Sequence, residues 1–290
     1  MHVHGSVGRT WAHPLRQTSV KFTSDRQTAI RSAAADARAR TLPVPTRPSE
    51  QCVQAAAAVE AAWKSGCARQ RVELLLPLIG ATDLDDWPGG VRQQFKAIQP
   101  LVEQMLRTLK QVEGLQGALV PELWDDGDAV ACYRSANFAA VIFPTASTLD
   151  KLRQLAEGPT APKLLIIINP QWESQGNLVS DFGIGPWRAQ REAFVATFST
   201  TYWLRQQRVY GDIVRVLHAH PGQWQVHRSS PTSNANECIS TQAALPTYAE
   251  IEALLRARPD SSINKSVMQR LQEEWEFNRK SMDQQQGPRL

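Results

Sequence analysis

The stretch KLLIIINP, Lys163–Pro170, places five consecutive Leu and Ile residues between one Lys and an Asn-Pro pair. The run is far shorter than the roughly 20 residues that a membrane helix needs. It is also too apolar for a strand that keeps one face in water, since such a strand alternates apolar and polar residues. The stretch therefore predicts a central strand of a parallel sheet that is covered on both faces.

Three upstream segments end in the same way, with an apolar run that stops at a proline: Arg71–Pro77, Ala118–Pro121 and Ala139–Pro144. Proline has no N–H to donate, so it marks the point where strand pairing ceases. Helical patterns separate these runs, and the order β-α-β-α is typical of α/β proteins. We expect an α/β fold with a mainly parallel sheet and helices on both faces, a Rossmann-like arrangement of three layers.

The C-terminal third of the chain has a different pattern. Gly211–His218 (GDIVRVLH) and Gln223–His227 (QWQVH) flank Pro221-Gly222, which predicts an antiparallel hairpin that extends the sheet. The sequence thus predicts one α/β domain over residues 48–260. A polar C-terminal helix and tail follow at 261–290, and a separate leader occupies 1–47.

The leader carries the positive charge of the chain. Residues 1–48 contain eight basic residues and two acidic ones, a net charge of +6, whereas the remainder has 24 basic and 26 acidic residues. The leader is rich in Arg and Ser and lacks a continuous apolar segment, which favours an organelle transit peptide followed by a disordered lead-in. The alternative is a basic tail that binds RNA or a membrane surface. The slightly acidic body predicts no nucleic-acid partner, since such binding depends on clustered Lys and Arg.

Polar residues follow several of the predicted strands. In open α/β sheets, ligands bind outside the carboxyl ends of the strands, where the strand order reverses. The segments expected at this rim are 83–90, 125–128, 145–147 and 169–172. The candidate ligand residues are Asp125, Asp126, Asp128 and Asn169, of which the three carboxylates could hold Mg²⁺. The alternative is that Asp126 caps a helix beginning near Gly127.

Catalytic signatures are missing from the sequence. It contains neither a G-x-x-x-x-G-K-[ST] loop nor a G-x-G-x-x-G turn, and its four cysteines form no C-x-x-C pair. A hairpin could bring His218, His220 and His227 together as a metal site, but an ordinary half-buried hairpin face is the simpler interpretation. We therefore predict no catalytic residue, no cofactor and no metal site.

Tryptophan is unusually frequent, with nine residues in the chain. Several lie in predicted loops or strand ends, where a large amphipathic ring either closes the core or anchors a partner. The candidate partner surface consists of Trp172, Trp187, Arg215 and Trp224.

The order of several motifs resembles a known family. The strand Arg71–Pro77 is followed by Pro88-Gly89-Gly90, then by INPQW at Ile168–Trp172, by FVATFSTTYWL at Phe194–Leu204, and by PGQW at Pro221–Trp224. Together these motifs resemble a plastid and cyanobacterial domain-of-unknown-function family over about Pro48–Leu255. That family includes the low photosystem II accumulation proteins, and the same domain follows the kinase module of a chloroplast adenylate kinase.

The resemblance implies a chloroplast protein of the stroma or thylakoid surface that assists photosystem II assembly through protein–protein contacts. Its implied partners are photosystem II core subunits and a membrane insertase, with peripheral contact to the thylakoid membrane. The family supplies no catalytic residues that could be carried over. The alternative is an enzyme or sensor that binds a nucleotide or phosphometabolite at the carboxyl-end rim.

Overall fold

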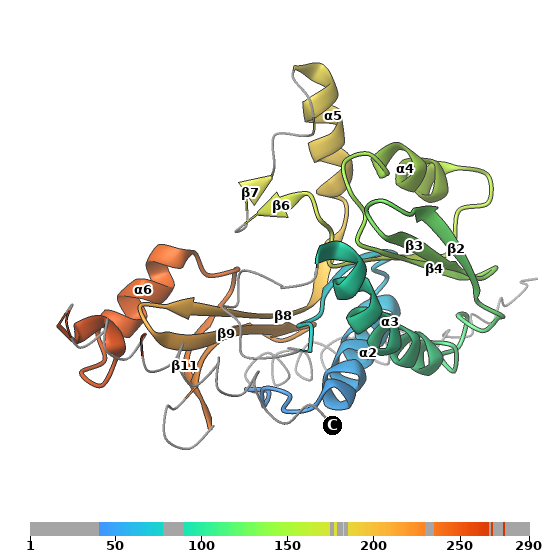
Figure 1. Cartoon of the computed structure of the whole chain (residues 1–290). Helices are drawn as coiled ribbons and strands as arrows, with labels where there is room; N and C mark the ends of the chain where they lie inside the picture. Colours follow the sequence, from blue (N-terminus) through green and yellow to red (C-terminus); the bar gives the residue numbers. More distant parts are fainter. Residues whose placement is uncertain are drawn as a thin grey trace, which may run out of the picture. The chain divides into compact units, whose positions relative to one another are not determined.

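The fold is built on a sheet of nine strands in the order β11-β10-β9-β8-β1-β5-β4-β3-β2. Figure 1 shows the sheet with the helices around it. The computed structural model describes residues 41–77, 90–174, 177–178, 182, 185–229, 235–266, 268 and 275. These residues all fall in one unit of the chain, 40–290. The strands are β1 (Arg69–Glu73), β2 (Val120–Asp125), β3 (Val130–Arg134), β4 (Phe138–Ile142), β5 (Leu164–Ile168), β8 (Ser199–Val209), β9 (Asp212–Ala219), β10 (Trp224–Ser229) and β11 (Asn236–Gln242).

Strand β5 confirms the prediction made for Lys163–Pro170. It pairs in parallel with β1 on one side and with β4 on the other, and all five of its residues are buried. Because both of its faces are covered, the strand can consist of Leu and Ile alone.

The mainly parallel, Rossmann-like sheet predicted from the sequence is wrong. Within the nine-stranded sheet of the described residues, only three strand pairs are parallel, namely β1 with β5, β1 with β8, and β4 with β5, whereas five pairs are antiparallel. The sheet is therefore mixed and mostly antiparallel, with the parallel strands β8-β1-β5-β4 in its middle. The difference arises at β2 and β3, which form an antiparallel meander with β4, and at β8, which continues antiparallel into β9, β10 and β11.

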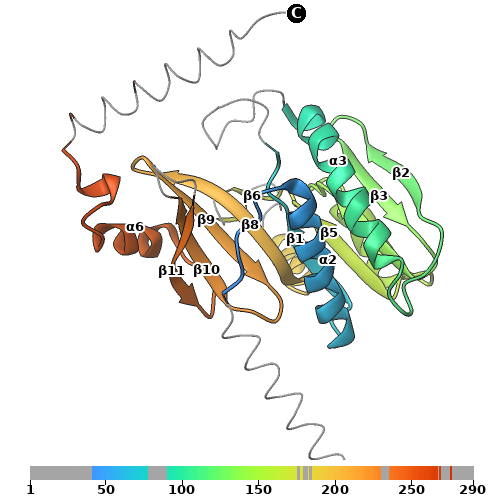
Figure 2. The ribbon, with the colours of Figure 1, turned by 90° about the horizontal axis from the view of Figure 1, so that it is seen from below.

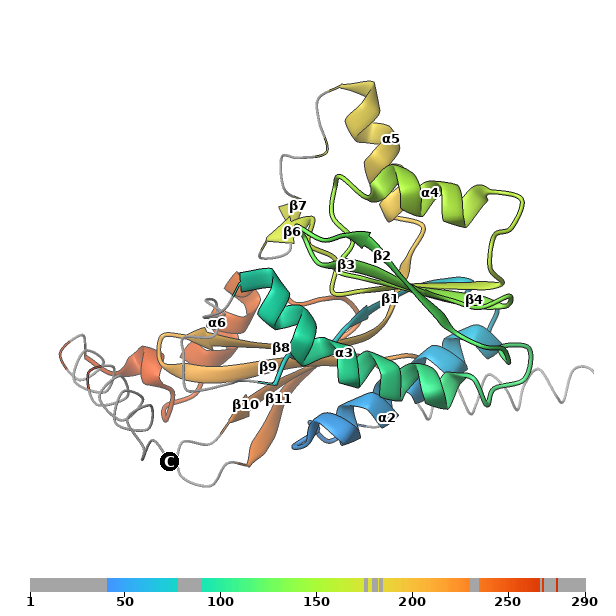
Figure 3. The same cartoon turned by 45° about the vertical axis from the view of Figure 1, so that its right-hand side comes forward.

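Helices cover both faces of the sheet, as expected. They are α2 (Pro48–Lys64), α3 (Gly90–Leu109), α4 (Leu149–Glu157), α5 (Pro186–Val195) and α6 (Tyr248–Arg256). Helices α2 and α3 pack on one face, and α4 and α5 lie on the other (Figure 3). Helix α6 packs through Ile251 and Leu255 against Trp203 and Val216 on the face of α4 and α5. No helix among the described residues has the length and hydropathy needed to span a membrane.

The predicted hairpin is confirmed: β9 and β10 pair antiparallel, and β11 adds a further strand. The residues just before α2, expected to be a lead-in, lie against the body (Figure 2). Val44 is 6% exposed, and the backbone N–H of Leu42 donates to Gln225 Oε1 at 3.1 Å. The rest of the leader, the segment 78–89 and most of 261–290 lie outside the described residues.

Candidate functional site

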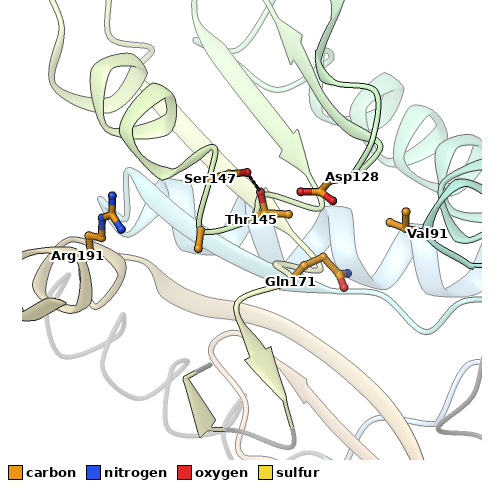
Figure 4. Close-up of a pocket in the computed structure, with 7 residues that line it drawn as sticks. Val91, Asp128, Thr145, Ser147, Gln171 and Arg191 are labelled. Carbon is orange, nitrogen blue, oxygen red and sulfur yellow. Dashed lines mark hydrogen bonds between the residues drawn. The ribbon is translucent and has the colours of Figure 1, made fainter. Parts of the chain in front are cut away.

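A polar hollow of about 560 Å³ lies at the carboxyl ends of β4 and β5 (Figure 4). Val91, at the start of α3, lines one part of it, and Asp128, from the turn between β2 and β3, lines another. The segment Thr145–Ser147 follows β4, Gln171 follows β5, and Arg191 comes from α5. Three of the segments predicted to form the rim therefore meet at one place.

The path of the chain explains why a hollow forms here. After β1 the chain passes to α3, on the face covered by α2. After the neighbouring strand β5 it passes to α5, on the opposite face. Adjacent parallel strands whose connections leave to opposite faces open a crevice beyond their carboxyl ends, and ligand sites of α/β sheets form in such crevices.

Left-handed backbone surrounds the hollow. Ala129, Phe143 and Asn169 have φ angles of 51°, 53° and 46°. Phe143 and Asn169 are each the first residue after a strand, and each precedes a proline. A non-glycine residue in this conformation costs about 1–2 kcal/mol and persists only where the surrounding structure imposes it. The two tight exits turn the chain out of the sheet and place Thr145 and Gln171 at the hollow.

The polar groups of the hollow are partly held by one another. Thr145 Oγ1 lies 2.7 Å from Ser147 Oγ, and the side-chain Nε2 of Gln171 donates to the carbonyl of Asn169 at 3.1 Å. Arg191 Nη2 lies 3.5 Å from Asp150 Oδ2, a long contact to a carboxylate that is 80% exposed. The hydroxyls, the amide and the guanidinium therefore converge on one solvent-accessible space.

Of the predicted ligand residues, only Asp128 lines the hollow. Asp125 holds the turn between β2 and β3, because its Oδ1 accepts from the backbone N–H of Asp128 at 3.1 Å. Asp126 points to solvent and pairs with Arg92 at 2.7 Å. The helix expected near Gly127 does not form, since β3 begins at Val130. The three carboxylates are thus separated into different roles.

Asn169 acts as a clamp between two strands. Its Oδ1 accepts from the backbone N–H of Leu74 at 2.7 Å, and its Nδ2 donates to the carbonyl of the same residue at 2.8 Å. The side-chain amide thereby copies one further rung of the pairing between β1 and β5. Both polar atoms of the Asn169 side chain are engaged, so Asn169 does not face a ligand itself. It fixes the backbone two residues before Gln171, which lines the hollow.

The predicted partner surface is mostly buried. Trp172 has no exposed surface and packs against Phe182, with ring centroids 6.2 Å apart. Trp224 is half-buried and stacks on His218 at 4.6 Å. Arg215 donates to Gln206 and Asn236. Of the four residues of the predicted partner surface, only Trp187 is exposed, at 73%.

Trp187 lines a groove of about 250 Å³ between α4 and α5. Leu149 and Phe194 line this groove but are only 1% and 5% exposed, so the accessible apolar surface there is mainly that of Trp187. Arg153, Arg191 and the exposed Asp150 supply charge of both signs. Arg191 therefore lines both the groove and the hollow.

Residues 45–253 match the model of a family described as a domain of unknown function, DUF1995. The chain belongs to the DUF1995 family. It matches no curated protein and no solved structure. The matched region of the DUF1995 domain begins within the segment that precedes α2 and ends within α6, so it includes both the hollow and the groove.

The DUF1995 domain also contains an ionic cluster that the sequence did not reveal. Glu73, the last residue of β1, is 1% exposed and pairs with Arg205 and, at 3.6 Å, with Arg71. The guanidinium groups of Arg71 and Arg205 lie over the ring of Trp203, at 5.0 Å and 4.5 Å from its centroid, respectively. Residues on strands far apart in the sequence form this cluster, so no local motif could indicate it.

Two cysteines and two histidines of the DUF1995 domain lie in the sheet and the helix that covers it: Cys52, Cys132, His218 and His227. Burial raises the pKa of the Cys52 thiol to about 11 and that of Cys132 to about 12, which disfavours the reactive thiolate. His227 pairs with Arg215 of β9, so these two side chains lie on one face of the sheet. His218 is three residues after Arg215 on the same strand and therefore lies on the opposite face. The described residues contain no group of three His, Cys, Asp or Glu that could hold a metal ion.

Proposed function

We propose that this protein is a chloroplast accessory factor that assists the assembly of photosystem II core subunits through protein–protein contacts at the thylakoid surface. The observation that carries the proposal is the exposure of Trp187 beside the groove between α4 and α5. The resemblance of the ordered motifs to those of the low photosystem II accumulation proteins and the basic, Arg-rich leader support the choice of organelle and process.

An exposed Trp beside a groove with charged walls is a suitable anchor for a protein partner. Trp is among the residues that contribute most binding energy at interfaces, because a large ring can be desolvated against a complementary surface. Trp187 offers apolar contact, and Arg153 and Arg191 supply two guanidinium groups beside the one carboxylate of Asp150. The groove therefore suits a segment with an apolar side chain that packs on Trp187 and with acidic flanks, located outside the membrane in a newly made subunit.

Affinity capture tests the proposal. Tagged protein is recovered from gently solubilised thylakoid membranes, and co-purifying proteins are identified by mass spectrometry. We expect core subunits of photosystem II and a membrane insertase, with capture strongly reduced by Trp187→Ala. Tyr248→Ala is the matched control, because Tyr248 is also an exposed aromatic residue, at 53%, but lies on α6. Equal capture by both variants, or the absence of membrane subunits, would refute the proposal.

The organelle is tested separately. A reporter fused behind residues 1–47 should enter isolated chloroplasts and be processed there. Import into mitochondria alone would contradict the chloroplast assignment and leave the surface at Trp187 to be explained by another partner.

A further inference from the structure

The hollow at the carboxyl ends of β4 and β5 has opposite charges on its two sides. Arg191 lies at one side and Asp128 at the other, and in Figure 4 the hydroxyls of Thr145 and Ser147 lie between them. Among the described residues that line it, Val91 and Ala146 have the only apolar side chains. A ligand that fits this space is consequently polar over most of its surface.

We propose that the hollow binds a small phosphorylated polyol such as a sugar phosphate, a function separate from the contact with protein partners. The phosphate group lies toward Arg191 and the hydroxyls of Ser147 and Thr145. Guanidinium groups and hydroxyls are efficient phosphate donors, since a charged donor shortens and strengthens the hydrogen bond. The sugar hydroxyls lie toward Asp128 and Gln171.

The acceptor side of the hollow suits hydroxyl groups. Gln171 already donates through Nε2 to the carbonyl of Asn169, which fixes its amide and leaves Oε1 as an acceptor. The side chain of Asp128 is exposed, and an ionised carboxylate accepts hydrogen bonds only. A row of donor hydroxyls on the ligand complements these two groups.

The contacts that hold Arg191 are long, so its guanidinium can turn toward a phosphate. Nη1 of Arg191 donates to the carbonyl of Phe182 at 3.4 Å. The contact between Arg191 and Asp150 is 3.5 Å long, and Asp150 is 80% exposed, so water competes effectively for this pair. A doubly charged phosphate inside the hollow offers a stronger partner than the exposed carboxylate. We expect ligand binding to replace the contact between Arg191 and Asp150.

The described lining of the hollow favours a sugar phosphate over a nucleotide. Its volume of about 560 Å³ is in the usual range for small-molecule sites. The lining that the structure describes contains no aromatic ring on which a base could stack. The clamp from Asn169 to Leu74 fixes the backbone just before Gln171 in the absence of a ligand, which reduces the cost of ordering this part of the lining.

The proposal is tested by isothermal titration of the purified full chain with ribose 5-phosphate, glucose 6-phosphate and glycerol 3-phosphate. We expect saturable binding of at least one of them, and at least about tenfold weaker binding of the same sugar without its phosphate. Arg191→Gln should weaken the phosphorylated probe at least about tenfold, whereas it should not change the affinity for the unphosphorylated one. No protein partner is present, so the result is independent of the proposed assembly role.

Two neighbouring residues provide matched controls. Arg188→Gln removes a charge from the same helix, and Asp126→Asn removes one from the same turn, yet neither residue lines the hollow. We expect binding within about twofold of the parent for both controls, and about tenfold weaker binding for Asp128→Asn. If Arg191→Gln is too unstable, the amide resonances of Gln171 and the Arg191 side chain are followed by NMR in the parent chain. The proposal is overturned if no probe saturates in the millimolar range, if either control matches its partner variant, or if neither resonance moves.

Discussion

Replacing Asn169 tests whether the clamp between β1 and β5 stabilises the fold. In Asn169→Ala, the backbone N–H and carbonyl of Leu74 lose partners that lie at 2.7 and 2.8 Å. Leu74 is 2% exposed, so water does not readily replace them. Leaving one buried polar group unpaired costs about 1–3 kcal/mol, which gives about 2–6 kcal/mol for the pair. The left-handed backbone at residue 169 adds about 1 kcal/mol for alanine.

Asn169→Gly separates these two contributions. Glycine loses both hydrogen bonds but accepts a φ of 46° without strain, so this variant should be more stable than Asn169→Ala by about 1 kcal/mol. Urea unfolding followed by circular dichroism measures both values. In a heat scan, each kcal/mol should lower Tm by about 2–4 °C for a domain of this size. If both variants unfold within about 1 kcal/mol of the parent, the clamp does not act as the hydrogen-bond geometry requires.

Asn169→Asp adds a test that depends on pH. The ionised carboxylate can accept from the Leu74 N–H but would face the Leu74 carbonyl without a proton to donate. The protonated acid can make both contacts, so folding should raise the pKa of this carboxyl above its unfolded value of about 3.9. A raised carboxyl pKa stabilises the fold below the unfolded value, and this stabilisation is lost as pH rises through the folded value. The deficit of this variant against the parent should therefore shrink in acid, and a constant deficit would contradict the proposed geometry.

Three further predictions concern other parts of the molecule. Asp212 is 4% exposed and accepts hydrogen bonds from Arg228 Nε and from the backbone N–H of Ser262, both at 3.0 Å. Asp212→Ala leaves the buried Arg228 without this partner and should lower the free energy of unfolding in urea by about 3–5 kcal/mol. A loss below about 1 kcal/mol would contradict this. Burial, and to a smaller extent the charge of Arg215, lowers the pKa of His227 to about 4. The unfolded chain takes up this proton near pH 6.5, so the free energy of unfolding should fall as pH drops from about 6.5 to about 4. The slope of this fall should be shallower in His227→Gln. Hydrogen bonds from the Thr46 backbone and from Arg47 hold the pKa of Glu50 at about 2, so its NMR titration should lie well below the usual range and return toward it when Thr46 is replaced by proline.

Sequence patterns identified the parts of this fold that depend on neighbouring residues. The apolar run Leu164–Ile168 and the hairpin of β9 and β10 have local signals that match the structure. Strand β8 does not. Phe194, Phe198 and Tyr202 are spaced as on one helical face, but α5 ends at Val195 and β8 begins at Ser199. Pairing with β1 and β9 decides the conformation of this segment, and strand preference depends on such long-range contacts more than helix preference does.

The hollow shows the same division. Asp128, Thr145–Ser147 and Gln171 were expected at one rim, because each follows or joins strands whose ends meet. Arg191 was not expected, since its place depends on how α5 packs beside α4. Asp125 and Asp126 were grouped with Asp128 by sequence alone, and the turn between β2 and β3 points their side chains away from the hollow.

The two strained exits show how one backbone requirement can be met by different side chains. Phe143 and Asn169 share a left-handed conformation before a proline, so each carries a similar backbone cost. Phe143 offsets it by burial, since its side chain has no exposed surface and packs edge-on against Phe95 with ring centroids 6.3 Å apart. Asn169 offsets it through two hydrogen bonds to Leu74. Glycine would fit the backbone at either position and would supply neither compensation, because it has no side chain. These side chains therefore contribute a core contact at the end of β4 and a clamp at the end of β5, each two residues before a residue that lines the hollow, Thr145 or Gln171.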